Sequence, residues 1–370
     1  YTIMPDDYQG GVLVQSALYP RYSLGDHLQI LCKLDIPDDP GYARYLRTQN
    51  IFVSCSFAKI EYLGAGKVAW GKQKLDQWRQ ALSAKINSLW PEPRSSLLAG
   101  ILYGDRGSMP KNLKDSFSNS GLSHIVAVSG YNTSVVAAVV LAVFIFVGCW
   151  RRKAFWLSSF SLVLFTFFTG ATASVVRAAV MAIFVMLGGY WGRPARMLNS
   201  LLLAASLMLF WNPVILFDLG FQLSFLATVG VAFVGPLLQK KSSFRLPSII
   251  EELCFTTLGA LIATLPLTIF YFGRIPALAL VANILVVGLI PVIMLFGFLA
   301  LFFSFFIFPI SLLLAFITDW GLRYIIFISD LCAGGSVTFS FSFVIMLVVY
   351  ALIGFWLYRL SLWQKKRKLK

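Results

Sequence analysis

The sequence predicts a polytopic α-helical membrane protein of about nine spans that carries a small N-terminal β module. Of its 370 residues, 58% are apolar and only 13% are charged, and the mean hydropathy is +0.77, whereas about a quarter of the residues in a soluble protein are charged. Long apolar runs follow one another from Leu122 onward. These observations exclude a cytosolic enzyme with one buried core, a disordered chain, a coiled coil and an outer-membrane barrel, whose strands would alternate.

Residues 1–65 are expected to form the β module. Apolar residues alternate in 27–34 and again in 51–57, so Cys32 and Cys55 each point to the apolar face of a strand. We expect the module on the oxidising side of the membrane, where a disulfide between these cysteines is favoured over two buried thiols. The module is thin for an independent core and the chain begins without a hydrophobic leader, so we expect it to be part of a longer protein.

Two segments lead from the module to the membrane domain. Residues 66–92 are expected to hold a linker and an amphipathic helix over 72–89, which lies in the membrane interface because its apolar residues recur at helical spacing between Lys and Arg. Residues 93–121 are expected to be a pre-membrane helical segment, and 122–370 the transmembrane domain. Its apolar spans are predicted near 122–150, 154–170, 174–191, 197–211, 219–238, 249–272, 279–305, 309–330 and 341–358.

Charge placement predicts how these spans are oriented. The formal net charge is +15, and the residues from Leu122 onward carry 17 basic and 5 acidic side chains. Basic clusters follow alternate spans at 151–153, 193–196, 240–245 and 365–370, whereas the opposite ends hold almost no Lys or Arg. By the positive-inside rule, the clusters and the C-terminal tail are cytoplasmic and the β module is extracellular or periplasmic.

Motifs for catalysis are poor in this sequence. Gly66–Lys72 begins like a phosphate-binding loop, but Gln73 stands where a Ser or Thr must hold magnesium. The two histidines, His27 and His124, are far apart, and no CxxC, HxH or HExxH motif is present. We therefore expect no metal, no cofactor, no nucleotide motor and no enzyme activity here, so any energy for transport must come from a partner or a gradient.

Polar residues gather where the first span begins, at Ser123, His124, Ser129, Gly130 and Asn132. On one continuous helix His124 and Asn132 would share a stripe. Lipid would penalise that polarity, so the stripe is expected to face a water-filled cavity or other helices. For the serines, the alternative is ordinary helix packing through small residues.

Later spans carry further polar residues. Arg177, with Ser174 nearby, lies about one turn inside a span, where it would either line a cavity or snorkel to the outer headgroups. Asp218, Gln222 and Ser224 open another span, where Asp218 would either line the cavity or cap the helix. A proline well inside a span, at 266, frees a carbonyl that should be packed against protein or a cavity.

Taken in order, these residues resemble a known family. The similarity lies in GDRGSMPKNLKDSFSNSGLSHIVAVSGYN, then SVVRAAVMA, NPVILFDLGFQLSFLAT, TLPLTIFYFGR and Asn283. They look like the competence domain of the ComEC family, the inner-membrane channels that pass one strand of incoming DNA during natural transformation. Residues 1–65 resemble the end of that family's extracellular OB-like module. The resemblance covers nearly the whole chain, and its motifs are long, ordered and collectively specific.

This resemblance implies a channel that moves single-stranded DNA through the bacterial inner membrane, surrounded by lipids. It also implies a DNA receptor and a cytoplasmic helicase or translocase as partners. Many members continue into a metallo-β-lactamase-like nuclease domain, whose histidine-rich motif is not in these residues, so nuclease activity is not carried over. The chain departs from the family where Gly130-Tyr131-Asn132 replaces a frequent Gly-Leu-His.

A strand of DNA is a polyanion, so its path needs a hydrated wall and a few cations. The expected cations near the entry are Arg106, His124, Arg177 and Arg274. The external module would stack bases on aromatic residues such as Tyr42, Tyr45 and Phe52. The full set of candidate path residues is Asp105, Arg106, Ser123, His124, Ser129, Gly130, Asn132, Ser174, Arg177, Asp218, Gln222, Ser224, Pro266, Arg274 and Asn283.

Three alternatives stay open. A secondary transporter of a small solute would use Arg177, Asp218 and Asp319 as intramembrane charges, although no inverted repeat is visible. An intramembrane hydrolase would pair Ser129 with His124, which have poor mutual geometry on a regular helix. A pure scaffold is disfavoured by so many polar residues at membrane depth.

Overall fold

The chain forms two compact units, 1–88 and 89–370. A computed structural model describes residues 2–3, 11–14, 25–36, 46, 51–65, 70–105, 107–126, 128–193, 196–239, 248–339 and 342–368. Arg106, Tyr42 and Tyr45 lie outside these described residues.

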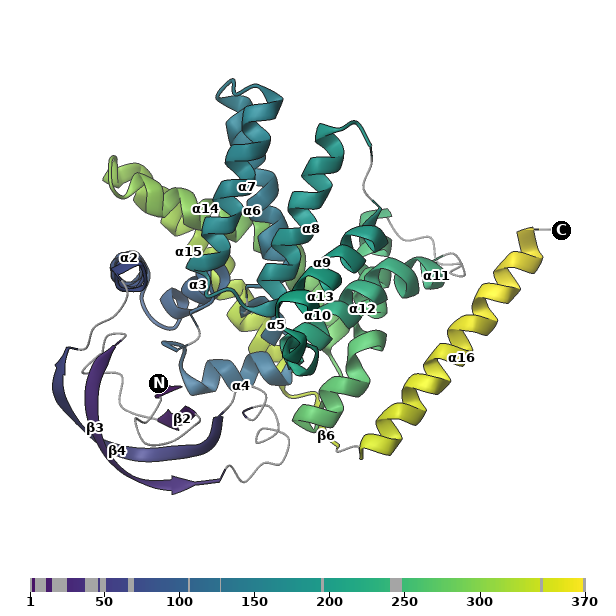
Figure 1. Cartoon of the computed structure of the whole chain (residues 1–370), viewed down its shortest axis with the longest axis horizontal. Helices are drawn as coiled ribbons and strands as arrows, with labels where there is room; N and C mark the ends of the chain where they lie inside the picture. The colour runs from purple at the N-terminus through teal and green to yellow at the C-terminus, as the bar shows by residue number, and fades with distance from the viewer. Residues whose placement is uncertain are drawn as a thin grey trace. The chain divides into compact units, whose positions relative to one another are not determined.

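The first unit contains a four-stranded sheet in the order β1-β2-β4-β3. Its strands are β1 (Thr2–Ile3), β2 (Gly11–Val14), β3 (Asp26–Asp35) and β4 (Ile51–Ala65). β1 is antiparallel to β2 and β3 is antiparallel to β4, whereas β2 and β4 are parallel. The two long strands, β3 and β4, curve together through the unit (Figure 1). Both predicted strands are therefore present, and the parallel pairing adds a crossover that alternation alone does not predict.

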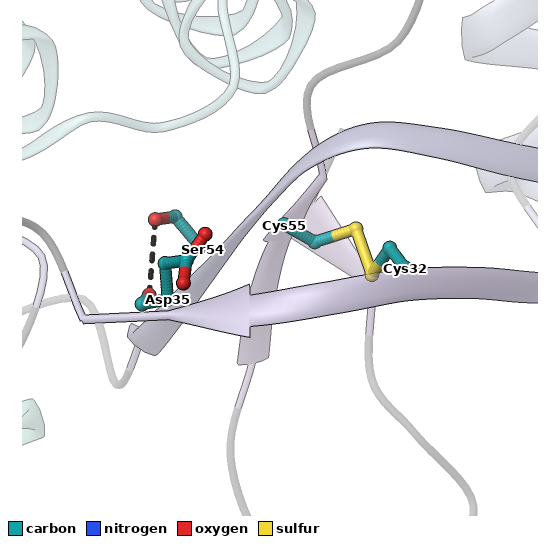
Figure 2. Close-up of a disulfide and its surroundings, with 4 residues drawn as sticks. All are labelled: Cys32, Asp35, Ser54 and Cys55. Atoms are coloured by element: carbon teal, nitrogen blue, oxygen red, sulfur yellow. Dashed lines mark hydrogen bonds between the residues drawn. A yellow bond between two sulfur atoms is a disulfide. The ribbon is translucent and has the colours of Figure 1, made fainter.

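A disulfide joins the two long strands. Cys32 on β3 and Cys55 on β4 are bonded, with their Cα atoms 5.9 Å apart (Figure 2). Cys55 is fully buried and Cys32 is half-buried. Beside the bridge, Ser54 Oγ donates a hydrogen bond of 3.2 Å to the Asp35 carbonyl oxygen. The bridge thus fixes β3 against β4 near the end of their pairing.

Two apolar side chains depart from the predicted pattern in the first unit. Leu34 was expected on the inner face, but it is 58% exposed. It pairs with the buried Cys55 one residue before the end of β3, beyond the register shift between Leu31 and Lys33. The amphipathic helix forms as α2 (Trp70–Leu89). Trp78 of its apolar stripe is exposed.

The second unit is almost entirely helical. It begins with three short helices, α3 (Arg94–Tyr103), α4 (Lys111–Asn119) and α5 (Ser123–Val126). Next come α6 (Gly130–Phe146), α7 (Arg151–Phe168), α8 (Ala173–Tyr190), α9 (Met197–Trp211), η1 (Pro213–Phe217), α10 (Leu219–Val229), the π-helical η2 (Gly230–Val234) and α11 (Gly235–Gln239). The last are α12 (Ser248–Phe272), β5 (Arg274–Pro276), α13 (Ala279–Val286), η3 (Val287–Leu289), α14 (Ile290–Phe303), α15 (Phe308–Ala333), β6 (Ser336–Thr338) and α16 (Phe343–Lys368).

Within the described residues, six helical segments are long and apolar enough to cross a membrane. They are Ala173–Tyr190, Leu219–Gln239, Glu251–Phe272, Ala279–Phe303, Phe308–Ala333 and Phe343–Leu360. The predicted count of about nine is not confirmed. The other three apolar runs do form helices, but α6 and α9 have only 17 and 15 residues and α7 opens with three basic side chains. The chain is thus a mostly helical membrane protein with a small N-terminal sheet.

Packing in the second unit brings α6, α7 and α8 alongside one another (Figure 1). α3 is buried along nearly its whole length and packs against α14 and α15. β5 and β6 form an antiparallel pair that joins the end of α12 to the end of α15. Segment η2–α11 lies so close to α12 that a Cβ on Gly235 would be 2.9 Å from the Phe255 carbonyl oxygen, so this crossing requires glycine.

Candidate functional site

Arg177 is buried inside the helical unit. It lies on α8, is 7% exposed, and donates from Nε to Ser224 Oγ at 2.7 Å and from Nη1 to Thr228 Oγ1 at 2.7 Å, both on α10. Nη1 also contacts the Met181 sulfur at 3.3 Å. Ser174 Oγ lies 3.1 Å from Ser224 Oγ and extends the hydroxyl group cluster. The snorkelling alternative is therefore wrong, since the guanidinium turns inward to α10.

The start of α6 lies against the same guanidinium. A Cβ on Gly130, the first residue of α6, would collide with Arg177 Nη2, so a larger residue there would require the guanidinium to move. Ser129 caps the helix, because its side chain accepts from the Asn132 backbone N–H. Asn132 Nδ2 in turn donates to the Ile101 carbonyl oxygen of α3 at 3.2 Å. α3, α6, α8 and α10 thus all hold this site.

The predicted continuous helix from 122 to 150 is wrong. α5 ends at Val126 and α6 begins at Gly130, so His124 and Asn132 do not share a stripe. Asn132 is 1% exposed, whereas Ser123 and His124 are exposed, and His124 Nδ1 lies 3.2 Å from the Gly121 carbonyl oxygen. The physical reason is the Ser129 cap, which accepts from the Asn132 N–H of the first turn and starts a new helix.

The electrostatics of the Arg177 site favour an anion. In the described part of the chain no acidic side chain pairs with Arg177, and its partners are two hydroxyls, a thioether and the Phe225 ring, 5.8 Å away. Neutral partners accept from Nε and Nη1 and leave the positive charge uncompensated. The amino end of α6 adds further positive potential. An unpaired cation inside a membrane helix bundle is expensive and marks a functional position.

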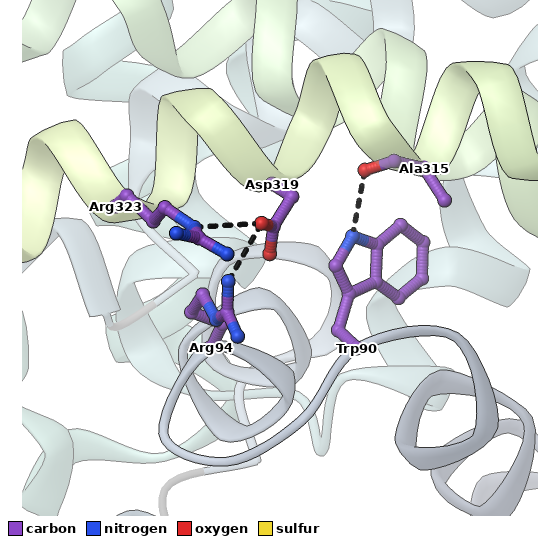
Figure 3. Close-up of polar contacts among 5 residues, drawn as sticks. All are labelled: Trp90, Arg94, Ala315, Asp319 and Arg323. Atoms are coloured by element: carbon purple, nitrogen blue, oxygen red, sulfur yellow. Dashed lines mark hydrogen bonds and ion pairs between the residues drawn. The ribbon is translucent and has the colours of Figure 1, made fainter.

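A second polar cluster ties α3 to α15. Arg94 Nη1 and Arg323 Nε both donate to Asp319 Oδ2, at 2.6 and 2.8 Å, and Trp90 Nε1 donates to the Ala315 carbonyl oxygen at 3.0 Å (Figure 3). Asp319 Oδ1 is buried without a hydrogen-bond partner among the described residues. Asp319 is thus neutralised by two arginines and serves as an anchor for α3.

The Arg177 site, and Asp319 and Arg323 of the second cluster, lie within a region that matches a known family. Residues 101–363 match the model for the competence protein family. The chain belongs to this family. Among curated proteins, ComE operon protein 3 of Bacillus subtilis (strain 168) is 25% identical over 252 residues, which are 68% of this chain and 32% of that protein. The chain therefore spans about a third of that relative's length. No solved structure matches it.

Three of the predicted site residues in the competence-family region make hydrogen bonds within their own turn or helix end. Asp218 caps α10 by accepting from the Phe221 N–H at 2.8 Å, as the capping alternative predicted. Gln222 Nε2 donates to the Leu216 carbonyl oxygen. Asp105 Oδ1 accepts from the Gly107 N–H in the loop after α3. These contacts hold turns and helix ends together.

Three further predicted residues lie apart from Arg177 in sequence and in their contacts. Pro266 is buried in α12. Arg274 is exposed on β5 and donates to Asn119 Oδ1 of α4 at 3.1 Å. Asn283 is buried in α13, where Nδ2 donates to the Ala279 carbonyl oxygen and Oδ1 has no partner among the described residues. The structure thus joins Ser174, Arg177, Ser224 and Gly130 in one site, and leaves these three outside it.

Sequence reasoning missed several members of both clusters. Thr228 follows Ser224 by four residues, so helical spacing offered a signal for it. Met181 follows Arg177 by the same interval. Arg94, in contrast, is 225 residues from Asp319, and no local pattern predicts that pair.

Proposed function

We propose that this competence-family chain forms the membrane conduit through which single-stranded DNA enters the bacterial cytoplasm during natural transformation. The family match, the Bacillus subtilis relative and the apolar helices support a role in DNA uptake through a membrane. The observation that carries the proposal is Arg177, a buried cation held by neutral side chains between α8, α10 and the start of α6.

A conduit for a polyanion needs positive charge that is sparse and fixed. A dense basic lining would hold DNA through many phosphate contacts, whereas a single cation lowers the barrier for each phosphate that leaves bulk water. Ser224 and Thr228 fix the guanidinium in place without neutralising it.

The remaining parts of the proposal concern the whole protein. The helices α6, α7 and α9 cross the membrane with the six longer segments, which gives nine crossings. The first unit is an OB-like module outside the cell that holds the strand, with the exposed Phe52 as a stacking residue. A DNA receptor outside and a helicase or translocase inside supply capture and energy, and the chain itself is not an enzyme.

The contacts of two acidic residues favour this function over a secondary transporter. A transporter would need Asp218 or Asp319 free to bind a coupling ion. Asp218 accepts from the Phe221 N–H, and Asp319 is paired with Arg94 and Arg323.

Substitution of Arg177 tests the proposal. Arg177→Met keeps the side-chain volume and removes the charge, so internalisation of labelled DNA should fall about tenfold or more, since a hydrogen bond to a charged group contributes about 1.5–3 kcal/mol. Arg177→Lys should keep part of the activity, because a point charge still attracts a phosphate. Uptake is measured at matched protein level, with DNA bound outside the cell counted separately.

Arg193→Met is the matched control, because Arg193 is exposed just beyond the other end of α8. It should leave uptake unchanged. Normal DNA uptake in Arg177→Met would remove Arg177 from the path. Loss of a small solute's uptake, with DNA uptake intact, would establish the transporter instead.

A further inference from the structure

We propose that a hollow between the start of α7 and the end of α8 binds the headgroup of an anionic phospholipid. The hollow has a volume of about 500 Å³ and is lined by Arg152, Lys153, Trp156, Leu157 and Tyr190. Its residues are distinct from those of the Arg177 site. The inference goes beyond the proposed function, since it holds whether or not DNA passes through the bundle.

The charge of the hollow calls for an anion. The first turn of α7 carries Arg151, Arg152 and Lys153, all exposed, and no acidic residue. Cations at the amino end of a helix interact unfavourably with the positive end of the helix dipole. The N-cap residue, Trp150, offers no side-chain hydrogen bond to the first-turn N–H groups. A phosphate group would relieve the charge repulsion and accept from those N–H groups as well.

Aromatic rings hold the basic side chains at the level where headgroups lie. Arg152 Cζ is 5.7 Å from the centroid of the Tyr190 ring. Tyr190 packs against Phe155 at 5.5 Å and against Trp191 at 6.5 Å between centroids. Trp156 and Trp191 are 67% and 66% exposed. Exposed Trp and Tyr beside Lys and Arg are typical of the boundary between acyl chains and headgroups.

The surface that continues from the hollow distinguishes a lipid from a nucleic acid. Further along α7, Phe160, Leu164 and Phe167 are 63%, 53% and 62% exposed and share one face by their spacing. The other face of α7, with Leu162 and Ser158, is buried. An acyl chain would lie along the exposed apolar face while its phosphate reaches Arg152 and Lys153. A DNA strand has no acyl chain that could lie along a helix of this length, so the stripe favours a phospholipid.

Lipid retention by the full chain tests this site. The protein is reconstituted in nanodiscs of equal phosphatidylcholine and phosphatidylglycerol, extracted into mild detergent, and its bound lipids are counted by native mass spectrometry. Wild-type protein should retain phosphatidylglycerol over phosphatidylcholine. The variant R152Q/K153Q should retain about tenfold less phosphatidylglycerol or lower still, because juxtamembrane basic residues each attract anionic lipid. Arg152→Lys should retain most of it.

The control variant K111Q/K114Q removes the same charge from α4 and should retain phosphatidylglycerol like wild type. Unchanged retention in a monodisperse R152Q/K153Q would overturn the proposal. So would lowered binding of a single-stranded oligonucleotide by that variant with lipid retention unchanged, or displacement of the lipid by free phosphate ion.

A second measurement needs no variant. A photoreactive phosphatidylglycerol should crosslink wild-type protein in the peptides around 150–157 and 188–193, and crosslinks confined to other helices would contradict the site.

Discussion

Gly130 is the residue whose lack of a side chain lets α6 approach the buried cation. A Cβ at this position would collide with Arg177 Nη2. Gly130→Ala should therefore displace the guanidinium from Ser224 and Thr228 and reduce DNA uptake severalfold, with a lower thermal stability in detergent, since overpacking costs about 1–3 kcal/mol. Uptake and thermal unfolding are measured on the same preparations.

Gly189→Ala is the control for Gly130→Ala, because a Cβ at Gly189 of α8 would meet nothing within 4 Å. Alanine favours a helix over glycine, so this variant should match or exceed wild-type stability. Equal DNA uptake and equal thermal stability of the two alanine variants would show that a Cβ at Gly130 does not displace Arg177.

The importance of a single residue could be predicted from the sequence where its chemistry conflicts with that of the residues around it. Arg177 is a permanent charge in an apolar run, so its importance is visible without a structure. The direction in which its side chain points is not visible in the sequence, because inward and outward positions of the guanidinium differ only in which helix lies beside it. The contacts with Ser224 and Thr228 decide this, and they depend on how α8 meets α10. The role of Asp218 as a cap follows from its position before an apolar run, which is local information.

At the scale of elements, α3 depends on α15 for its position. Arg94 pairs with Asp319 at 2.6 Å, and both side chains are largely buried. Arg94→Ala should lower the free energy of unfolding by about 2 kcal/mol, less than the 3–5 kcal/mol for a buried pair that loses its only partner, because Arg323 still pairs with Asp319. Thermal unfolding in detergent measures the loss.

Arg323→Ala provides the comparison, since it removes a partner of the same carboxylate. The Arg323 side chain is 61% exposed and follows Asp319 by four residues on one helix. Its removal should therefore cost at most about 0.5 kcal/mol. A larger loss for Arg323→Ala than for Arg94→Ala would mean that the pair does not anchor α3.

The helical structure of the apolar runs could be predicted from their periodicity, but the positions at which the helices break could not. All nine predicted apolar runs contain helices, since their composition alone favours that structure. The break between α5 and α6 was missed because Ser129 reads equally well as a helix-facing polar residue and as a cap. The π segment η2 was missed because its close approach to α12 depends on Gly259, far along the chain.

For the whole molecule, the structure adds a constraint to the charge pattern. β5 pairs with β6, with Ile275 opposite Val337, so the ends of α12 and α15 lie at the same end of the bundle. Arg274 also contacts Asn119, which ties α4 to that end. If successive helices cross alternately, the basic segments at 151–153 and 193–196 fall at the opposite end. The positive-inside rule then predicts β5, β6 and α4 outside the cytoplasm.

Cysteine labelling tests this orientation. Cys149, Cys254 and Cys332 are free and can be replaced by Ser or Ala, while Cys32 and Cys55 stay in their disulfide and remain unreactive.

On this background, Ala277→Cys after β5 should react with an impermeant maleimide in intact cells, because Ala277 is exposed at the end that carries few charges. Arg193→Cys, exposed beyond α8, should react only after the membrane is permeabilised. DNA uptake by both variants shows that the labelled protein is the working one.

The reverse pattern of labelling would invert the whole bundle and place the basic clusters outside, where they would face incoming DNA. The same pattern at both positions would instead contradict the alternate crossing of α9 through α12.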